Sequence, residues 1–242
     1  MRDFRSFYNQ RQFWHWNYLD YGLANSFFLR ELKKICSQNE IHSILDLGCG
    51  STNELRDYCK SSNIVYFGLD RIRTPEVVPW EGVRFPKEIP HSFDLIVSNG
   101  FLHYAPDLEI LFEEISKHLI KGRLLVSTPL LSPLSTFDAL AEYHEHWRIM
   151  PKGAETLMGR YGIKLTNIIY PGGTSTFLSI LNSLLFWRLI KGKDQRLSKI
   201  GTVFFPIFLI VTIINNFLGL LLNHFAKSEA FASFYIISGE RK

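Results

Sequence analysis

Short apolar runs alternate with amphipathic stretches over the middle of the chain. Four such runs, rich in β-branched and aromatic residues and without polar alternation, lie at 42–48, 63–70, 93–100 and 122–129. This composition is typical of strands that are covered on both faces. Between the runs, apolar residues recur at helical spacing over 23–35 and 108–119. The alternation predicts an α/β fold with a parallel sheet and helices on both of its faces.

The later part of the chain changes in character. Pro151–Tyr161 has the pattern of a short helix, whereas Ile163–Tyr170 and Phe231–Ser238 have the pattern of strands. A short third strand is predicted at Val83–Phe85. The stretch before the last strand is strongly apolar and predicts an inserted helical hairpin. The sequence therefore divides into an N-terminal helical segment (1–40), an α/β domain (41–170 and 229–242) and an apolar helical insert (171–228).

The sequence ILDLGCGST at 44–52 carries the sharpest chemical signal. A predicted strand runs through Asp46 into Gly48 and Gly50, and a helix follows. Glycines at these positions let the backbone approach a ligand, and the helix N-terminus attracts anionic groups. Asp70 ends the next strand, where a carboxylate can accept hydrogen bonds from ribose hydroxyls. Because Asn53 replaces a third glycine, a dinucleotide fits poorly. The simpler alternative is a tight strand–helix turn without a ligand.

Four segments together resemble the class I S-adenosylmethionine-dependent methyltransferases. They are DLGCG (46–50), FGLD (67–70), FDLIVSNGFLHYAPD (93–107) and ISKHLIKGRLLVSTP (115–129). The resemblance covers about residues 40–170 and implies a Rossmann-like seven-stranded sheet whose last strand is antiparallel. It also implies S-adenosylmethionine as the cofactor. It places Asp46, Gly48, Cys49 and Gly50 at the methionine end, Asp70 at the ribose, and Asn99 in the lining of the pocket.

Three residues are candidates for catalysis. His103 follows the fourth predicted strand, near the expected position of the methyl group, and could act as a base. His146 and Arg148 lie in EYHEHWRIMPKG (142–153), a region over the cofactor pocket in the related fold. The alternatives are a structural histidine and a surface salt bridge. His144 and His146 lack a third metal ligand, so no metal site is predicted.

Composition and charge indicate which classes of partner molecule to expect. Apolar residues make up 46% of the 242 residues, and the net charge is +4. The segment from Pro171 to Ser228 alone carries +5, so the rest of the chain is slightly acidic. A nucleic-acid partner is not expected, because the positive charge lies in the most apolar region. The three cysteines show neither disulfide nor metal spacing, and residues 1–20 lack an export signal, which favours a cytoplasmic setting.

The apolar insert raises the question of a membrane. Val203–Leu222 is almost wholly apolar and long enough to span a bilayer, whereas Phe177–Ile190 is too short. A basic connector, RLIKGKDQRLSK (188–199), separates the two stretches. We expect the insert to embed in the cytoplasmic membrane surface without crossing it. A homodimer interface through the insert and a true span are the alternatives.

These features predict a methyltransferase that acts on an amphipathic small molecule or a lipid-linked or surface-glycan precursor at the membrane. The motif SNG, in place of N/D-P-P-Y/F, favours an oxygen acceptor over the amino group of a base. Two other hypotheses stay open at this point. One is a non-catalytic membrane assembly protein of the same fold, and the other is an integral membrane protein with a nucleotide-binding head.

Overall fold

The computed structural model describes the chain over residues 15, 18–50, 54–72, 77–131, 145–173, 175, 176, 178, 180–182, 205–225 and 228–241. The chain forms two compact units. The sheet unit comprises Phe28–Leu130, Glu142–Ile169 and Tyr235–Lys242. The helical unit comprises Met1–Phe27, Leu131–Ala141 and Tyr170–Phe234.

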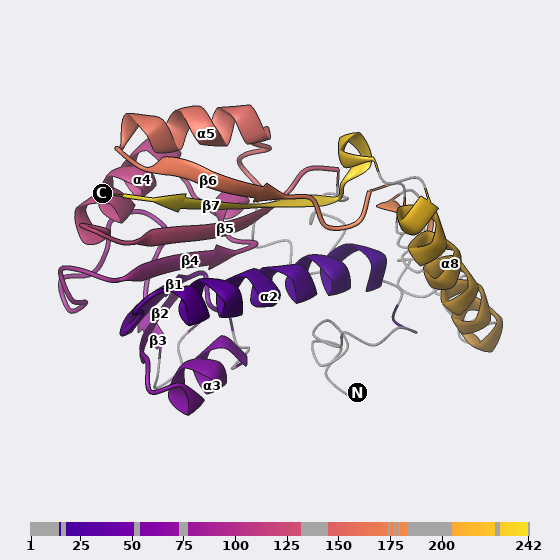
Figure 1. Cartoon of the computed structure of the whole chain (residues 1–242), viewed down its shortest axis with the longest axis horizontal. Helices are drawn as coiled ribbons and strands as arrows, with labels where there is room; N and C mark the ends of the chain where they lie inside the picture. Colours follow the sequence, from indigo (N-terminus) through magenta and orange to yellow (C-terminus); the bar gives the residue numbers. More distant parts are fainter. Residues whose placement is uncertain are drawn as a thin grey trace. The chain divides into compact units, whose positions relative to one another are not determined.

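Seven strands form one sheet in the order β3-β2-β1-β4-β5-β7-β6 (Figure 1). They are β1 (Ser43–Leu47), β2 (Val65–Asp70), β3 (Val77–Pro79), β4 (Leu95–Asn99), β5 (Arg123–Pro129), β6 (Lys164–Ile169) and β7 (Phe234–Glu240). The first five strands pair in parallel, and β6 pairs antiparallel with β7. This arrangement confirms the predicted α/β class and the antiparallel last strand.

Four helices flank the strands in the chain. They are α2 (Leu23–Gln38), α3 (Glu54–Ser61), α4 (Leu108–His118) and α5 (Pro151–Arg160). In Figure 1, α2 passes in front of the sheet and α4 lies behind it. On α4 the fully buried residues Leu111, Phe112 and Ile115 recur at helical spacing and form its core-facing stripe. Strand β1 is buried at Ile44, Leu45 and Leu47, as expected of a strand covered on both faces.

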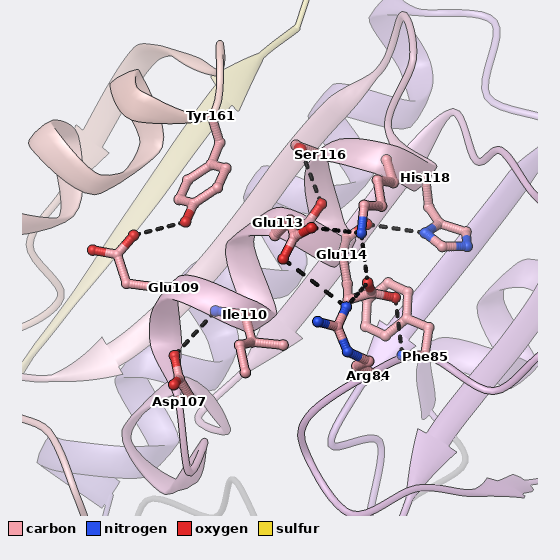
Figure 2. A network of polar contacts seen from close by, with 11 residues as sticks. Arg84, Phe85, Asp107, Glu109, Ile110, Glu113, Glu114, Ser116, His118 and Tyr161 are labelled. Atoms are coloured by element: carbon pink, nitrogen blue, oxygen red, sulfur yellow. Dashed lines mark hydrogen bonds and ion pairs between the residues drawn. The ribbon is translucent and has the colours of Figure 1, made fainter.

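The short third strand is Val77–Pro79, so its prediction at Val83–Phe85 was wrong. Side chains occupy the backbone groups of the predicted segment. The N–H of Phe85 donates to Glu114 Oε2 at 3.1 Å, and the Arg84 carbonyl accepts from Trp80 Nε1 at 3.0 Å. Figure 2 shows Arg84 and Phe85 both turned toward Glu114 on α4. Because these backbone groups already bind side chains, they are not available for the hydrogen bonds that pair one strand with another.

Helix α4 begins immediately after the loop that follows β4. Asp107 caps it, because its Oδ1 accepts from the N–H of Ile110 at 3.0 Å (Figure 2). A carboxylate at this position satisfies a free N–H and favours the positive end of the helix dipole. Glu109, in the first turn of α4, accepts from Tyr161 Oη at 2.7 Å and from Arg160 at 2.7 Å. These contacts tie the start of α4 to the end of α5.

The apolar insert is helical, as predicted. Its main element is α8 (Phe205–Phe225), and Thr176 and residues 180–182 are also helical. The first arm of the predicted hairpin, Phe177–Ile190, lies largely outside the described residues. In the helical unit, α8 packs on the π-helical turn η1 (Tyr18–Gly22), where the Gly219 position leaves no room beside Leu19.

Candidate active site

The loop between β1 and α3 is the centre of the candidate site. Gly48 and Gly50 have φ angles of 70° and 62°, in the left-handed region that favours glycine. The N–H groups of Gly48 and Cys49 donate to the Leu69 carbonyl at 2.8 and 3.2 Å. These bonds fix the loop against the end of β2. Ser51 and Asn53 lie outside the described residues.

The two glycines differ in what surrounds them. A Cβ on Gly48 would lie 2.4 Å from the Cβ of Phe101, whereas a Cβ on Gly50 would meet no atom of the described residues within 4 Å, its chain neighbours aside. Gly48 therefore permits close packing between this loop and the loop after β4. Gly50 faces open space, which leaves its backbone accessible to a ligand.

Asp70 closes the other side of the loop. Its Oδ2 accepts from the N–H of Gly50 at 2.8 Å, and its Oδ1 accepts from the N–H of Ile72 at 2.9 Å. Each carboxylate oxygen has a further lone pair. Asp70 is therefore held in place while it keeps the capacity to accept hydrogen bonds from a ligand.

Asp46 is buried beneath the same loop. Its pKa is raised to about 7: burial is the main cause, a hydrogen bond from Tyr66 opposes the rise, and the nearby Asp70 carboxylate adds to it. Tyr66 Oη donates to Asp46 Oδ2 at 2.9 Å. Tyr66 was not predicted as a site residue, although it lies on β2 immediately before the FGLD segment (67–70).

Cys49 is a buried and unreactive thiol. Burial, together with Asp46 and Asp70, raises its pKa to about 12, so the thiolate is scarce near neutral pH. A Cβ at Gly68 would come within 2.8 Å of Cys49 Sγ, which shows how tightly the thiol packs on β2. Asn99 lies at the end of β4, where its Oδ1 accepts from Ser127 Oγ at 2.6 Å. The roles of both residues toward a cofactor stay predictions.

His103 occupies the 3₁₀ turn η2 (Leu102–Tyr104) after β4. Its side chain is buried, and neither ring nitrogen has a hydrogen-bond partner among the described residues. Its pKa is lowered to about 4: burial is the main cause, Glu145 opposes the fall, and Arg148 adds to it. His103 is therefore a neutral imidazole at ordinary pH. Phe101, two residues earlier, brings this turn against Gly48.

The segment 145–148 lies against the backbone of His103. The N–H groups of His146 and Trp147 both donate to the His103 carbonyl, at 2.8 and 3.3 Å. Arg148 forms an ion pair with Glu145 through its Nε at 2.9 Å and its Nη2 at 2.5 Å. Glu145 was not predicted as a site residue. It holds Arg148 in an ion pair, and its negative charge raises the pKa of His103. His144 lies outside the described residues.

A surface pocket of about 580 Å³ adjoins this segment. Its lining combines one exposed indole with acidic, basic and hydroxyl side chains: Asp107, Leu108, Glu109, Trp147, Lys152, Gly153, Thr156, Leu157 and Arg160. Trp147 is held by a bond of 2.8 Å from its Nε1 to the Ala105 carbonyl. Trp147 therefore belongs both to the segment at His103 and to the wall of this pocket.

Over the residues that the structure describes, no three or more His, Cys, Asp or Glu side chains come together in a way that could hold a metal ion. The candidate site thus comprises the loop with Gly48 and Gly50, the carboxyl groups of Asp46 and Asp70, and the buried imidazole of His103 in the turn after β4.

The comparisons with known proteins identify the class. A family model described as "Methyltransferase domain" matches residues 13–165, so the chain belongs to this methyltransferase family. A search of curated protein sequences finds no significant match.

Solved structures with a similar fold include several methyltransferases and a [4+2]-cyclase. A putative sarcosine dimethylglycine methyltransferase from Galdieria sulphuraria has a TM-score of 0.57 at 13% identity, covering 90% of this chain and 84% of that one. A SAM-dependent methyltransferase from Archaeoglobus fulgidus has a TM-score of 0.52 at 18% identity, covering 90% and 94%. An O-methyltransferase from Brevibacillus brevis, solved with S-adenosylhomocysteine, has a TM-score of 0.54 at 14% identity, covering 88% and 71%. At these identities the likeness concerns the fold.

The protein is therefore a class I S-adenosylmethionine-dependent methyltransferase. Its loop residues suit this cofactor: Gly50 leaves open space, Asp70 is a fixed acceptor, and Asp46 is a buried acid. We expect Asp70 to hold the ribose and Asp46 to face the methionine end. When bound, the cofactor supplies an electrophilic methyl group on a sulfonium sulfur.

Proposed function

We propose that this methyltransferase transfers a methyl group to a hydroxyl oxygen of a membrane-proximal acceptor, with His103 as the base. The acceptor would be a lipid-linked or surface-glycan precursor at the cytoplasmic membrane face. The observation that carries the proposal is a buried imidazole, without a hydrogen-bond partner among the described residues, in a turn that touches the cofactor loop through Phe101.

Methylation of a hydroxyl oxygen requires a base that accepts the hydroxyl proton during methyl transfer. Bound S-adenosylmethionine would supply the methyl group, and its sulfur would keep the electron pair of the carbon–sulfur bond that breaks as the acceptor oxygen bonds to the methyl carbon. The hydroxyl proton becomes strongly acidic during this step, so a base whose pKa is about 4 suffices to take it. A neutral ring nitrogen of His103 would receive the proton, and the nearby Glu145 carboxylate would stabilise the resulting imidazolium.

Arg148 and His146 support this arrangement in different ways. Arg148 is engaged by Glu145, so its first role is to hold that carboxylate in place. Its side chain remains 28% exposed, which allows it to meet an anionic acceptor group as well. His146 is exposed, and its backbone N–H holds the His103 carbonyl. We therefore propose His103 as the base and assign His146 a positioning role.

The pocket beside Trp147 supports an acceptor with a polar head. An aromatic face combined with a few convergent polar groups is typical of small-molecule sites. Lys152 and Arg160 add positive charge, and Asp107 and Glu109 add hydrogen-bond acceptors. A phosphorylated or polyhydroxylated head group matches this mixture. The apolar α8 supports the membrane-proximal location of such an acceptor.

The test uses purified full-length protein, methyl-labelled S-adenosylmethionine, and membranes from cells that lack the gene. We expect label in the lipid-linked or glycan fraction, with the products heavier by one methylene group in mass spectrometry. Chemical cleavage should place the label on oxygen. Label that appears only in water-soluble metabolites would overturn the membrane-proximal acceptor, and label on nitrogen would overturn the oxygen assignment.

The role of His103 is tested separately. His103→Ala should lower kcat by roughly 10²–10⁴-fold with little change in cofactor affinity, because a general base contributes about this much. His146→Ala, a neighbouring histidine whose side chain is exposed, is the matched control and should change kcat far less. Equal rates for His103→Ala and wild type would reject the proposed base. Cofactor binding without transfer to any acceptor fraction would instead favour the non-catalytic assembly protein.

A further inference from the structure

Helix α8 has its polarity reversed relative to a helix of a water-soluble protein. Nine of its exposed residues are large and apolar, with 36–80% relative exposure, and Pro206 and His224 near its ends are also exposed. This outer face consists of Ile207, Ile210, Ile213, Ile214, Phe217, Leu218, Leu221, Leu222 and Phe225. At about 100° per residue these positions share one half of the helix circumference. A soluble helix would turn this half toward the core.

The opposite side of α8 is polar and buried. Thr212 and Asn216 are fully buried, and Asn215 and Asn223 lie on the same side. Gly219 sits among them and brings the helix backbone close to Leu19. We call these residues of α8 the inner face. The helix thus presents its hydrogen-bonding groups to its own unit and its apolar groups to the surroundings.

Hydrogen bonds hold the inner face in this orientation. Asn215 Nδ2 donates to Asn182 Oδ1 at 2.7 Å, and Asn216 Nδ2 donates to the His15 carbonyl at 3.0 Å. Asn223 Nδ2 donates to Ser175 Oγ at 2.7 Å, and its Oδ1 accepts from the Ser175 N–H at 3.1 Å. Rotating α8 to bury its apolar face would break these bonds and expose the asparagines. The outward apolar face is therefore fixed by the fold of the unit.

The topology limits how α8 can meet a bilayer. Of the helices in the described part of the chain, one is long and apolar enough to cross a membrane, over Pro206–Phe225, and 22% of its most apolar stretch is buried. It lies between β6 and β7 in the chain, and these strands pair antiparallel in one sheet. A single crossing would separate the two strands by the membrane. The candidate second crossing, Phe177–Ile190, has only 14 residues and one arginine.

We propose that α8 lies in one leaflet of an anionic phospholipid bilayer, with its outer face among the acyl chains. Helices that lie in the interface bury one apolar face and use neighbouring cations to attract anionic lipids. The sequence supplies these cations directly before α8, at Arg188, Lys191, Lys193, Arg196 and Lys199, against the single acid Asp194. This charge selects a lipid surface over a second copy of the chain, which would bring the same cations together.

This inference deepens the proposed function by naming how the enzyme reaches its acceptor, yet its test does not need catalysis. Full-length protein is mixed with phosphatidylcholine vesicles, with or without phosphatidylglycerol, and floated through a density gradient. Wild type should float with the phosphatidylglycerol vesicles, and added salt should weaken the binding. Failure of the wild type to float would overturn the proposal.

A matched pair of substitutions tests the outer face. Ile210 and Ile120 are both 57% exposed, but Ile120 lies in the sheet unit between α4 and β5. Ile210→Glu should reduce vesicle binding at least about tenfold, because a carboxylate would enter the acyl region. Ile120→Glu should bind like wild type. Equal binding by both variants would overturn the assignment, and an unchanged helix content by circular dichroism verifies that Ile210→Glu is folded.

Two further outcomes would replace the lipid by another arrangement. A stable soluble dimer that Ile210→Glu dissociates, seen by analytical ultracentrifugation, would assign the outer face to a second copy. A crossing is tested with Ile207→Cys and Phe225→Cys in a Cys36→Ser background on preformed vesicles. Because both positions lie on the outer face, an impermeant maleimide added outside should label both poorly and to a similar extent. Protection of one position only would establish a span and overturn the one-leaflet arrangement.

Discussion

The backbone N–H of Gly50 donates to the Asp70 carboxylate over 2.8 Å, linking the loop after β1 to the end of β2. The two residues are 20 positions apart in the chain. The same carboxylate accepts from the N–H of Ile72 at 2.9 Å. One side chain therefore both shapes the cofactor loop and supplies the acid expected at the ribose.

The first prediction concerns this carboxylate. Asp70→Ala removes the anchor of the loop and a charged acceptor for the ribose, and such hydrogen bonds contribute about 1.5–3 kcal/mol each. The dissociation constant for S-adenosylmethionine should rise at least about tenfold in titration calorimetry. Asp57→Ala, at an exposed aspartate on α3, is the control and should leave binding unchanged. Unchanged affinity in Asp70→Ala would remove Asp70 from the cofactor site.

The second prediction separates the two glycines of the loop. Gly48→Ala places a Cβ within 2.4 Å of Phe101 and adds left-handed strain, whereas Gly50→Ala adds the strain alone. Left-handed backbone costs roughly 1–2 kcal/mol and overpacking a further 1–3 kcal/mol. Urea unfolding should therefore show a clearly larger loss for Gly48→Ala. In the pair with Phe101→Gly, which also removes the Cβ of Phe101, the double variant should lose less stability than the two single variants added together. Equal losses for the two glycines would show that Phe101 does not constrain Gly48.

The third prediction follows from the buried acid beneath the loop. Burial raises the pKa of Asp46 to about 7, so below this pH the free protein holds a proton there. A cationic methionine end favours the ionised form, and binding must then release the proton. Affinity for S-adenosylmethionine should increase with pH, by up to about tenfold per unit below pH 7, and level off above it.

Tyr66 tests the same linkage. Tyr66→Phe removes the hydrogen bond that lowers the pKa of Asp46, so the plateau of affinity should move to higher pH. Tyr161→Phe is the control, because its hydroxyl bonds to Glu109 on α4 instead. Calorimetry in buffers of different ionisation enthalpy measures the released proton. A pH-independent affinity in wild type would contradict the placement of Asp46 at a cationic group.

The sequence was sufficient to predict those helices, strands and loops that have a recognisable pattern within a short segment. Buried strands such as β1 and β4 are short apolar runs, and the glycine loop with Asp70 has a recognisable spacing. The edge strand β3 was misplaced because three residues carry little periodic signal. Its competitor at Val83–Phe85 is apolar for another reason: Phe85 is buried, and its N–H is bound by Glu114.

Contacts between distant segments could not be predicted in the same way. Tyr66 and Glu145 act through Asp46 and His103, which depends on side-chain directions in three dimensions. The reversed polarity of α8 also needs the structure. The sequence shows asparagines within an apolar stretch, but only the bonds to Asn182, Ser175 and His15 show which side faces inward.

The fourth prediction concerns the contribution of His103 to stability. Burial lowers its pKa from 6.5 to about 4 in the folded protein, so between these values the unfolded chain binds a proton that the folded protein does not. The contribution of this group to the free energy of unfolding therefore rises with pH from about 4 to about 6.5 and is constant above. Its full size is on the order of 3 kcal/mol.

The difference in unfolding free energy between wild type and His103→Gln isolates the contribution of His103. This comparison is needed because Asp46, with its raised pKa, makes stability fall as pH rises over an overlapping range. Urea unfolding across this pH range should show a wild-type advantage that grows with pH. His91→Gln, at an exposed histidine, is the control. A constant difference between wild type and His103→Gln would mean that His103 titrates as it does in the unfolded chain.

The last prediction applies the same titration to turnover. A base must be unprotonated to act, and the pKa of His103 is about 4. With cofactor and acceptor both saturating, which removes the effect of Asp46 on cofactor affinity, kcat should stay constant from neutral pH down to about pH 5 and fall below it. Arg148→Ala removes the cation that lowers this pKa and frees Glu145, which raises it, so the fall should move to higher pH. If the wild-type kcat already halves near pH 6.5, the base titrates like an imidazole in water, which contradicts the lowered pKa. If the pH profile of kcat is not shifted in Arg148→Ala, the Glu145–Arg148 pair does not influence the base.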